Sequence, residues 1–189
     1  MIKISDLCFA FKDTTVFDHL NLHIPDGEIT ALMAPSGKGK STLLRLIAGL
    51  IKPDSGSIEL GGRSVGIMFQ EPRLFSQLTV LQNVMLVMPS KKDGKRCAMK
   101  LLEDFGVSNA AEKYPDELSG GMAKRVSLAR AIAYDADILL LDEPFSALDE
   151  QTKQDVILQA KRLLDGKTVI LVTHDQSEAQ SFAHNTLTL

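Results

Sequence analysis

Hydrophobic and polar residues alternate in the first part of the chain, and short apolar runs follow. The alternation at Ile2 and Ile4, and again over residues 20–24, is typical of β-strands with one buried face. Four later runs are mainly apolar and too short for typical helices: 28–33, 65–69, 138–141 and 168–172. Strands buried on both faces have this pattern, so it predicts a parallel sheet that is covered by helices on both sides.

The segments between these runs have helical periodicity. One predicted helix covers residues 41–50 and ends near Gly49, and another covers 151–164. The long stretch 79–134 is also predicted to be helical, with three breaks at Pro89, Gly106 and Pro115. The predicted fold class is therefore α/β, with a block of helices inserted into a mostly parallel sheet structure.

Length and composition are those of one globular domain. The chain has 189 residues, of which 44% are hydrophobic and 24% are charged, and about 150 residues correspond to one domain. We expect a single domain over 1–189. Its core would be formed by about 1–71 and 135–189, and its helical subdomain by about 72–134.

Charge and cysteine content exclude several functions. The chain has 21 basic and 24 acidic residues and a net charge of −3, so we expect no nucleic-acid partner. Cys8 and Cys97 are the only cysteines and form no CxxC motif, so the sequence predicts neither a disulfide framework nor a zinc site. The apolar runs are shorter than the ~18 residues that a membrane-spanning helix needs. These features predict a soluble, cytosolic domain with reduced thiols.

A loop rich in glycine and lysine connects the strand predicted at 28–33 to the helix predicted at 41–50. It consists of Ala34, Pro35, Ser36, Gly37, Lys38, Gly39, Lys40, Ser41 and Thr42. Glycines let backbone N–H groups surround an anion, and the following helix adds its positive dipole end. Lys40 is placed to reach the β- and γ-phosphates, and the Ser41 hydroxyl to hold Mg²⁺. A turn with incidental lysines is the alternative, but the strand–loop–helix context favours a phosphate loop.

A second candidate element is the apolar run 138–141, which ends in two carboxylates. Ligands gather at the carboxyl ends of parallel strands. Asp142 is therefore expected near the phosphate loop, where it could help to hold Mg²⁺, and Glu143 is suited to orient or deprotonate an attacking water. Taken alone, this pattern is equally typical of an ordinary strand end.

Four further motifs make a family resemblance specific. They are Gln70 within 68–72 (MFQEP), Leu118-Ser119-Gly120-Gly121-Met122, Phe145-Ser146-Ala147-Leu148-Asp149, and Val172-Thr173-His174-Asp175. Together with the phosphate loop and the acidic strand, and in this order, they resemble the ATP-binding cassette (ABC) ATPases over essentially the whole chain. The resemblance implies a P-loop NTPase core with a small N-terminal antiparallel β subdomain and an inserted helical subdomain.

The resemblance also implies a site shared by two cassettes that lie head to tail. Lys40 and Ser41 of one chain would hold ATP and Mg²⁺, while Ser119, Gly120 and Gly121 of the other would approach the γ-phosphate. One ATP would thereby join two chains, in a homodimer or a heterodimer, and hydrolysis would loosen them.

Individual roles follow from the same resemblance. Gln70 would sense the γ-phosphate and Mg²⁺, and His174 would be the switch histidine. With Lys40 and Glu143, these two residues complete the expected catalytic set. Asp149 would cross to the partner, although it could equally cap a helix.

The adenine would stack on an aromatic side chain near the N-terminus. Phe11, with Val16 nearby, stands at the corresponding place, and packing in the core is the alternative for both.

The chain departs from the family pattern at three positions. Met122 replaces the usual glutamine, so we expect weaker contact with the partner's nucleotide. Lys38 adds a cation where a small residue is commoner. Ala34 replaces glycine, which would cost ~1–2 kcal/mol if its φ had to be positive. The motif spacing implies trimmed β and helical subdomains, and because 15 residues follow His174 we expect no regulatory C-terminal domain.

The predicted function is the motor subunit of an ABC transporter. It would work with separate integral membrane permease subunits and an extracytoplasmic substrate-binding protein, at the cytoplasmic face of the membrane. The stretch 71–84 most resembles importers of the nitrate, sulfonate, taurine and thiamine group. Four of its apolar residues could receive the permease or fill the core: Phe75, Leu78, Leu81 and Val84. The alternatives are a soluble cassette of the iron–sulfur-assembly type and a degenerate cassette that does not hydrolyse ATP.

Overall fold

The computed structural model describes residues 1–12, 14–35, 37–89 and 93–189. Eight strands form two sheets in the described part of the chain. An antiparallel sheet has the order β2-β1-β4, and a parallel sheet has the order β5-β6-β7-β3-β8. This arrangement confirms the predicted α/β fold with a mostly parallel sheet and a small antiparallel β subdomain.

The antiparallel sheet has two long strands and one short edge strand. They are β1 (Ile2–Phe11), β2 (Thr14–Ile24) and β4 (Ser55–Glu59). The strands of the parallel sheet are β3 (Ile29–Met33), β5 (Val65–Met68), β6 (Ile138–Asp142), β7 (Thr168–Thr173) and β8 (Asn185–Thr188). β3, β5, β6 and β7 fall where continuous apolar runs predicted them, whereas β4, β8 and the helix before β8 had no such signal.

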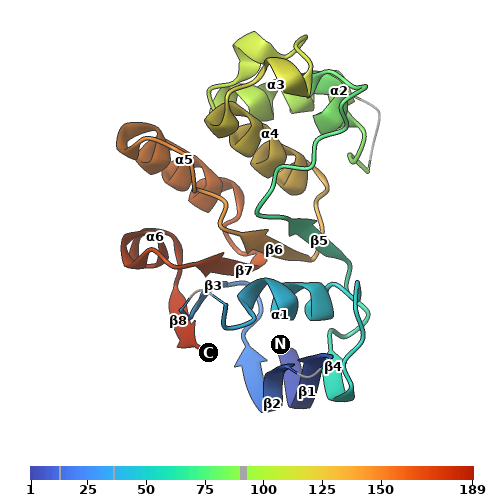
Figure 1. Ribbon diagram of the computed structural model, residues 1–189. Helices are drawn as coiled ribbons and strands as arrows, with labels where there is room; N and C mark the ends of the chain where they lie inside the picture. The colour runs from blue at the N-terminus through green and yellow to red at the C-terminus, as the bar shows by residue number, and fades with distance from the viewer. Residues whose placement is uncertain (13, 36, 90–92) are drawn as a thin grey trace.

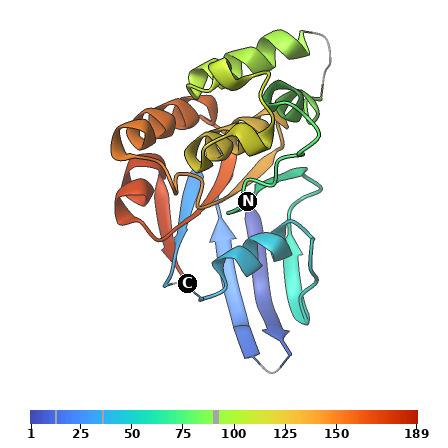
Figure 2. The same ribbon diagram turned by 45° about the horizontal axis from the view of Figure 1, so that its top comes forward.

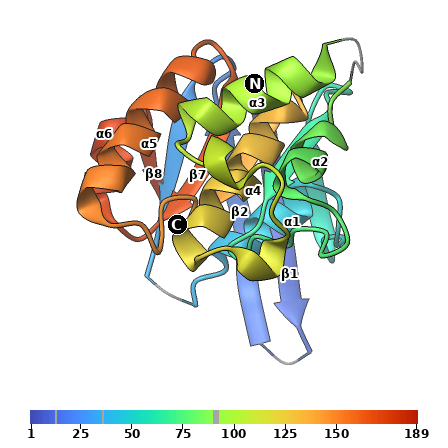
Figure 3. The ribbon, with the colours of Figure 1, turned by 90° about the horizontal axis from the view of Figure 1, so that it is seen from above.

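Helices cover both faces of the parallel sheet, as Figure 1 shows. α1 (Lys40–Ile47) lies on one face, and α4 (Gly120–Ala133), α5 (Glu150–Leu163) and α6 (Gln176–Phe182) lie on the other. Within the helical block, α4 is accompanied by α2 (Val80–Met85), α3 (Gly94–Asp104) and two 3₁₀ turns at Ser108–Ala110 and Pro115–Glu117. Seen from above, α5 runs beside this block (Figure 3).

Side chains of the central strands point alternately into two hydrophobic clusters. Ile138 and Leu140 face α1, whose Leu43 and Leu44 also contact the antiparallel sheet. Leu139 and Leu141 face the helical side instead. The antiparallel hairpin projects away from the parallel sheet (Figure 2), and α1 lies between the two sheets (Figure 1). The β1–β2 hairpin and the carboxyl ends of β3 and β6 thus come to one side of α1.

None of the helices in the described ranges is long and apolar enough to cross a lipid bilayer. The apolar segment 75–84 has a mixed environment. Leu81 and Val84 are buried in the core, while Phe75 is 50% exposed. Core packing is thus the role of the helical half of this segment, and only Phe75 presents a large apolar surface to solvent.

Candidate functional site

Most of the predicted nucleotide-site residues line one hollow of about 450 Å³. They come from the β1–β2 hairpin, the loop before α1, the segment after β5 and the end of β6. The lining residues are Phe11, Thr14, Val16, Gly37, Gly39, Lys40, Ser41, Thr42, Gln70, Asp142 and Glu143. Thr14 is the one member that the sequence did not single out, because nothing in its local pattern distinguishes it from other hairpin residues.

The loop conformation depends on two glycines. Gly37 and Gly39 have φ angles of 82° and 80°, in the left-handed region that L side chains rarely adopt. At Gly39 a Cβ atom would also come within 2.4 Å of the Val16 side chain. Ala34 is not among the described residues with positive φ, so the strain considered for this substitution does not arise. Ser36 was predicted as a loop member and lies outside the described residues.

The Lys40 ammonium group lies against the loop itself. Lys40 is buried, and its Nζ donates hydrogen bonds to the carbonyls of Ala34 (2.7 Å) and Pro35 (3.2 Å). The cation is thereby held beside the glycine-rich backbone, where an anion would be attracted. Lys38 is exposed and does not line the hollow, so its charge acts on the site only from outside.

Asp142 lies at the buried end of β6 and meets the first turn of α1. Burial raises the pKa of Asp142, and a hydrogen bond from the Ser41 hydroxyl opposes that shift. The carboxylate and the hydroxyl are hard oxygen donors of the kind that Mg²⁺ prefers. Gln70 lines the same hollow and adds an amide oxygen, so the residues present fit a magnesium ion.

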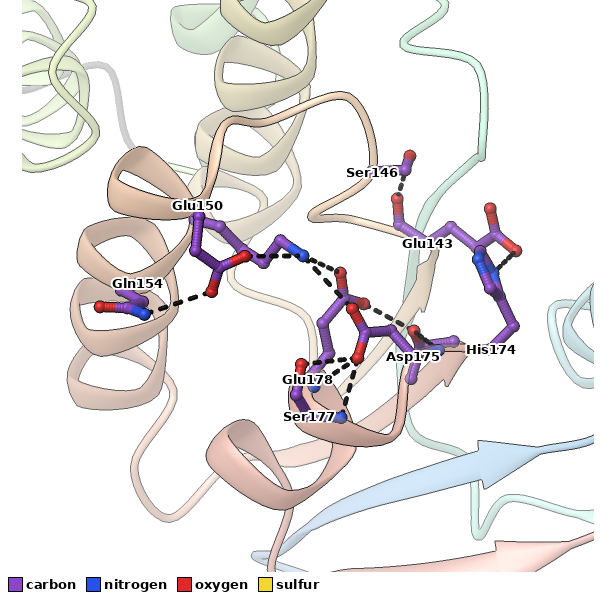
Figure 4. A network of polar contacts seen from close by, with 10 residues as sticks. Glu143, Ser146, Glu150, Gln154, His174, Asp175, Ser177 and Glu178 are labelled. Atoms are coloured by element: carbon purple, nitrogen blue, oxygen red, sulfur yellow. Dashed lines mark hydrogen bonds and ion pairs between the residues drawn. The ribbon is translucent and has the colours of Figure 1, made fainter.

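Glu143 is held by two partners, which follow the ends of β5 and β7. Its Oε2 accepts a hydrogen bond from Gln70 Nε2 at 3.0 Å, and its Oε1 lies 2.9 Å from His174 Nδ1. Figure 4 shows Glu143 and His174 facing each other at the ends of β6 and β7. Three of the four residues predicted to be catalytic are therefore in direct contact, and the fourth, Lys40, lines the same hollow.

Helix α4 binds the backbone of the Gln70 segment through three side chains spaced three residues apart. Lys124 is buried, and its Nζ donates a hydrogen bond to the Gln70 carbonyl. Ser127 donates to the Pro72 carbonyl (3.1 Å), and Arg130 donates to the same carbonyl (2.9 Å) and to the next one along the chain (3.0 Å). Burial lowers the pKa of Lys124, and the nearby carboxylates of Glu143 and Asp142 oppose that shift. The sequence did not point to this face.

The Ser119–Gly121 motif does not line the hollow. Ser119 caps α4 and its hydroxyl accepts a hydrogen bond from the Met122 N–H (3.3 Å). A Cβ on Gly121 would lie 3.1 Å from the Ala147 carbonyl, whereas a Cβ on Gly120 would meet nothing within 4 Å. The motif therefore lies against the segment that leads to Asp149, and the Met122 side chain packs on the hydrophobic cluster of the helical side.

Asp149 is the N-cap of α5. Its carboxylate accepts a hydrogen bond from the Thr152 N–H at 3.0 Å, and this bond is the main cause of the lowered pKa of Asp149. The capping interpretation is therefore confirmed, and a contact with a partner chain remains a prediction.

A polar network joins α5 to the segment that carries His174. Lys153 Nζ lies 3.3 Å from Asp175, 3.6 Å from Glu178 and 3.6 Å from Glu150. Glu178 also accepts a hydrogen bond from the Thr173 hydroxyl at 2.6 Å. Figure 4 shows Asp175 and Glu178 at the start of α6 and Glu150 at the start of α5. The two residues that flank His174 are thus both anchored.

The parallel sheet, the glycine-rich loop before α1 and the carboxylates of Asp142 and Glu143 together define the class of P-loop proteins. The family model described as "ABC transporter" matches residues 17–146. The chain belongs to this family.

Curated relatives support the same assignment. The chain is 41% identical over 198 residues to the Sulfate/thiosulfate import ATP-binding protein CysA of Mycobacterium tuberculosis, covering 96% of this chain and 56% of the relative. It is 40% identical to the protein of that name from Synechocystis, with coverages of 96% and 56%. The chain thus spans a little over half the length of these relatives.

Solved structures of a single cassette match over nearly their whole length. One is a dimeric structure of a post-hydrolysis state of the ATP-binding cassette MJ0796 bound to ADP and Pi. It has a TM-score of 0.91 and 32% identity, and the match covers 100% of this chain and 94% of that one. A second dimeric structure of MJ0796, described as a bacterial ABC transporter cassette, also has a TM-score of 0.91 and 32% identity. Its match likewise covers 100% of this chain and 94% of that one. The fold of this chain is therefore that of an ABC cassette.

Proposed function

We propose that this chain is the ATP-binding and ATP-hydrolysing motor subunit of an ABC importer. The observation that carries the proposal is the carboxylate of Glu143, held by Gln70 and His174 beside a phosphate loop and the Ser41–Asp142 pair. A protein that only bound a nucleotide would have no need of a carboxylate fixed at this position.

The proposed chemistry assigns one task to each group around the hollow. Backbone N–H groups of residues 37–42 and the Lys40 cation bind the phosphates. Ser41 and Asp142, with Gln70, would hold Mg²⁺, which supplies positive charge to the phosphate oxygens. Glu143 orients the attacking water and accepts its proton. His174, 62% exposed and in contact with Glu143, would reach the γ-phosphate.

The base of the nucleotide would stack on Phe11. This ring is 49% exposed and lines the hollow, and it packs edge-on against Phe9 with centroids 4.8 Å apart. Support from Phe9 fixes the ring without covering the face that a base would use.

The active unit in this proposal is a head-to-tail dimer. Ser119 and the adjacent glycines lie outside the hollow of their own chain, so they are available to a second copy or to a related cassette. The helix that they begin would present N–H groups to the partner's γ-phosphate.

In the proposed wider assembly, the chain binds permease subunits at the cytoplasmic face of a membrane. A substrate-binding protein on the other side delivers substrate to these permease subunits. Import is favoured because the relatives are named as import proteins for sulfate and thiosulfate. The finer resemblance of residues 71–84 to the nitrate, sulfonate, taurine and thiamine group remains part of the proposal. The exposed Phe75 ring, with the Arg130 guanidinium 5.9 Å from its centre, is the candidate contact with the permease.

The substitution Glu143→Gln tests the proposal in the full chain. It keeps the shape of the side chain but removes the proton acceptor, so ATP turnover should fall by roughly 10²- to 10⁴-fold. ATP affinity should stay unchanged, and a dimer should accumulate with ATP in sedimentation velocity. Lys40→Ala is the matched control and should lose both ATP binding and the dimer. Turnover of Glu143→Gln at the wild-type rate would overturn the assignment.

A further inference from the structure

The β1–β2 hairpin carries a cluster of three potential metal ligands. The ligand atoms of Cys8, Asp18 and His19 all lie within 4.8 Å of one another. The pairing of the strands explains why they meet. Leu7 pairs with Leu20 and Phe9 pairs with Phe17, so two residues of β2 lie opposite Cys8 alone. This is a β-bulge, and it turns Asp18 and His19 toward the same thiol.

The imidazole of His19 is oriented in the way that metal-bound histidines are. Its Nδ1 lies 2.6 Å from a carboxylate oxygen of Asp6, and because that carboxylate can only accept, Nδ1 carries the proton. The lone pair of Nε2 then points away from Asp6, and Nε2 lies 3.8 Å from Asp18 Oδ1. A carboxylate that holds the far nitrogen is the usual support of a metal-bound histidine.

Backbone polar groups of the bulge are bonded to the side chains of Asn21 and Cys8. Asp6 and His19 have φ angles of 52° and 51°, a conformation that is rare for residues other than glycine. The Asn21 side chain accepts a hydrogen bond from the Asp6 N–H (2.9 Å) and donates one to the His19 carbonyl (2.8 Å). The His19 N–H donates to Cys8 Sγ at 3.4 Å, so the bulge also holds the sulfur beside His19.

Thiolate, imidazole and carboxylate form a donor set typical of Zn²⁺. Ligands of one tetrahedral Zn²⁺ are about 3.5 Å apart, so closing the cluster requires movements of roughly 1 Å. The side chains of His19 and Asp18 are 68% and 80% exposed and are free to make them. Three protein ligands leave the fourth position for water.

We propose that Cys8, Asp18 and His19 bind a Zn²⁺-class cation, with Asp6 orienting the imidazole. The site is separate from the Ser41–Asp142 pair and does not depend on the proposed ATPase activity. Cys8 is three residues from Phe11, and His19 is three residues from Val16. Phe11 and Val16 both line the hollow proposed to bind the nucleotide, called the nucleotide hollow below. A bound cation would therefore fix the strand pair that forms one wall of that hollow.

Co²⁺ provides the test, because a bound thiolate gives it an intense near-ultraviolet absorption. We expect the reduced, nucleotide-free full chain to show this absorption at one Co²⁺ per chain, and Zn²⁺ to abolish it. Cys97→Ser, which removes the other cysteine, should keep the absorption, and Cys8→Ser should lose it. Absence of the absorption in the wild type, or its persistence in Cys8→Ser, would overturn the proposal.

Two further variants keep the test decisive if Cys8→Ser does not fold. Asp18→Asn changes an exposed side chain, and His19→Asn keeps a residue type that tolerates the left-handed conformation. Each should weaken Co²⁺ binding at least tenfold, and Asp6→Asn should weaken it by about 10- to 100-fold. Wild-type affinity in both Asp18→Asn and His19→Asn, with folding verified by circular dichroism, would contradict the assigned ligands.

Discussion

Glu143 has an unusual backbone conformation for a residue with a side chain. Its φ is 47°, in the left-handed region that costs a non-glycine residue roughly 1–2 kcal/mol. The surrounding bonds impose this conformation. The Glu143 N–H donates to the Val172 carbonyl at 2.9 Å, and the Glu143 carbonyl accepts from the Ser146 hydroxyl at 2.9 Å. This strain directs the carboxylate toward Gln70 and His174, as expected for strain at functional sites.

The strain predicts an inverted order of stability at this position. Glycine normally destabilises a fold by roughly 0.5–1 kcal/mol relative to alanine. Glycine adopts the left-handed region freely. The free energy of unfolding of Glu143→Gly should therefore equal that of Glu143→Ala or exceed it by up to about 1 kcal/mol. Urea denaturation of both variants measures the difference. The exposed helical position Gln154 is the control, where the glycine variant should be less stable than the alanine variant. If the glycine variant were also the less stable one at Glu143, the strain argument would be refuted.

Local sequence patterns and the family resemblance were sufficient to predict every residue of the nucleotide hollow except Thr14, but not the residues that position them. Lys40 and Ser41 belong to a local strand–loop–helix pattern, and Asp142 and Glu143 follow an apolar strand. Lys124 acts on the Gln70 carbonyl from 54 residues away, and no local pattern specifies how α4 packs on that segment. Long-range contacts of this kind required the structure.

At the scale of elements, Lys153 ties α5 to the segment between β7 and α6. Its side chain is 16% exposed, and its ammonium group lies within 4 Å of three carboxylates. Asp175, one of the three, also caps α6, and a hydrogen bond from the Ser177 hydroxyl is the main cause that lowers its pKa to about 2. His174 lies between two anchored neighbours, so Lys153 is positioned to fix the angle from which His174 reaches Glu143.

Removing this cation should impair turnover more than nucleotide binding. We expect Lys153→Met to lower kcat by about 2- to 30-fold, the effect of ~0.5–2 kcal/mol of coupling, with KM for ATP nearly unchanged and Lys153→Arg restoring kcat. Lys161→Met is the matched control, since Lys161 joins α5 to the Ser181 carbonyl in α6 (3.1 Å) but lies far along the helix from His174. Equal loss of kcat in both methionine variants would show a merely structural role.

The same variant should have a characteristic pH dependence of stability. Burial raises the pKa of Glu178, and the Thr173 hydroxyl and Lys153 oppose that shift. A raised carboxyl pKa favours the folded state at low pH and disfavours it as pH rises through the folded-state value. Without Lys153 this penalty grows, so Lys153→Met should lose roughly 1–3 kcal/mol near pH 7. This loss of stability should shrink as the pH is lowered and Glu178 becomes protonated. A loss that stayed constant with pH would show that Glu178 is not its source.

The elements missed by the sequence patterns lie at the edges of the sheets. β4 and β8 are short, largely exposed and rich in polar residues, so neither alternation nor an apolar run marks them. They form because a neighbouring strand, β1 or β3, offers unpaired backbone groups. Central strands were predictable because burial on both faces dictates their composition.

At the scale of the whole molecule, the residues proposed to form the ATPase site occupy two separate surfaces. The hollow contains the phosphate loop and the Glu143 carboxylate, whereas the Ser119–Gly121 motif lies outside it, with Gly121 against residues 147–148 of the chain leading to α5. The two glycines are also not equivalent. Gly121 is enclosed by the Ala147 carbonyl, but Gly120 faces open space, so a side chain at Gly120 would project outward from the start of α4 without disturbing the fold.

This separation predicts complementation between two inactive chains. Lys40→Ala destroys the hollow, and Gly120→Asp adds a carboxylate that repels the partner's γ-phosphate, so neither variant should hydrolyse ATP alone. In a mixed dimer the hollow of the Gly120→Asp chain meets the intact Ser119 motif of the Lys40→Ala chain, and one complete site results. Half of the dimers in an equal mixture are mixed, with one working site out of two, so the mixture should recover about a quarter of the wild-type rate. If each chain formed its site from its own residues, the mixture would stay inactive. The double variant carrying both substitutions in one chain, mixed with itself, supplies the baseline for this measurement.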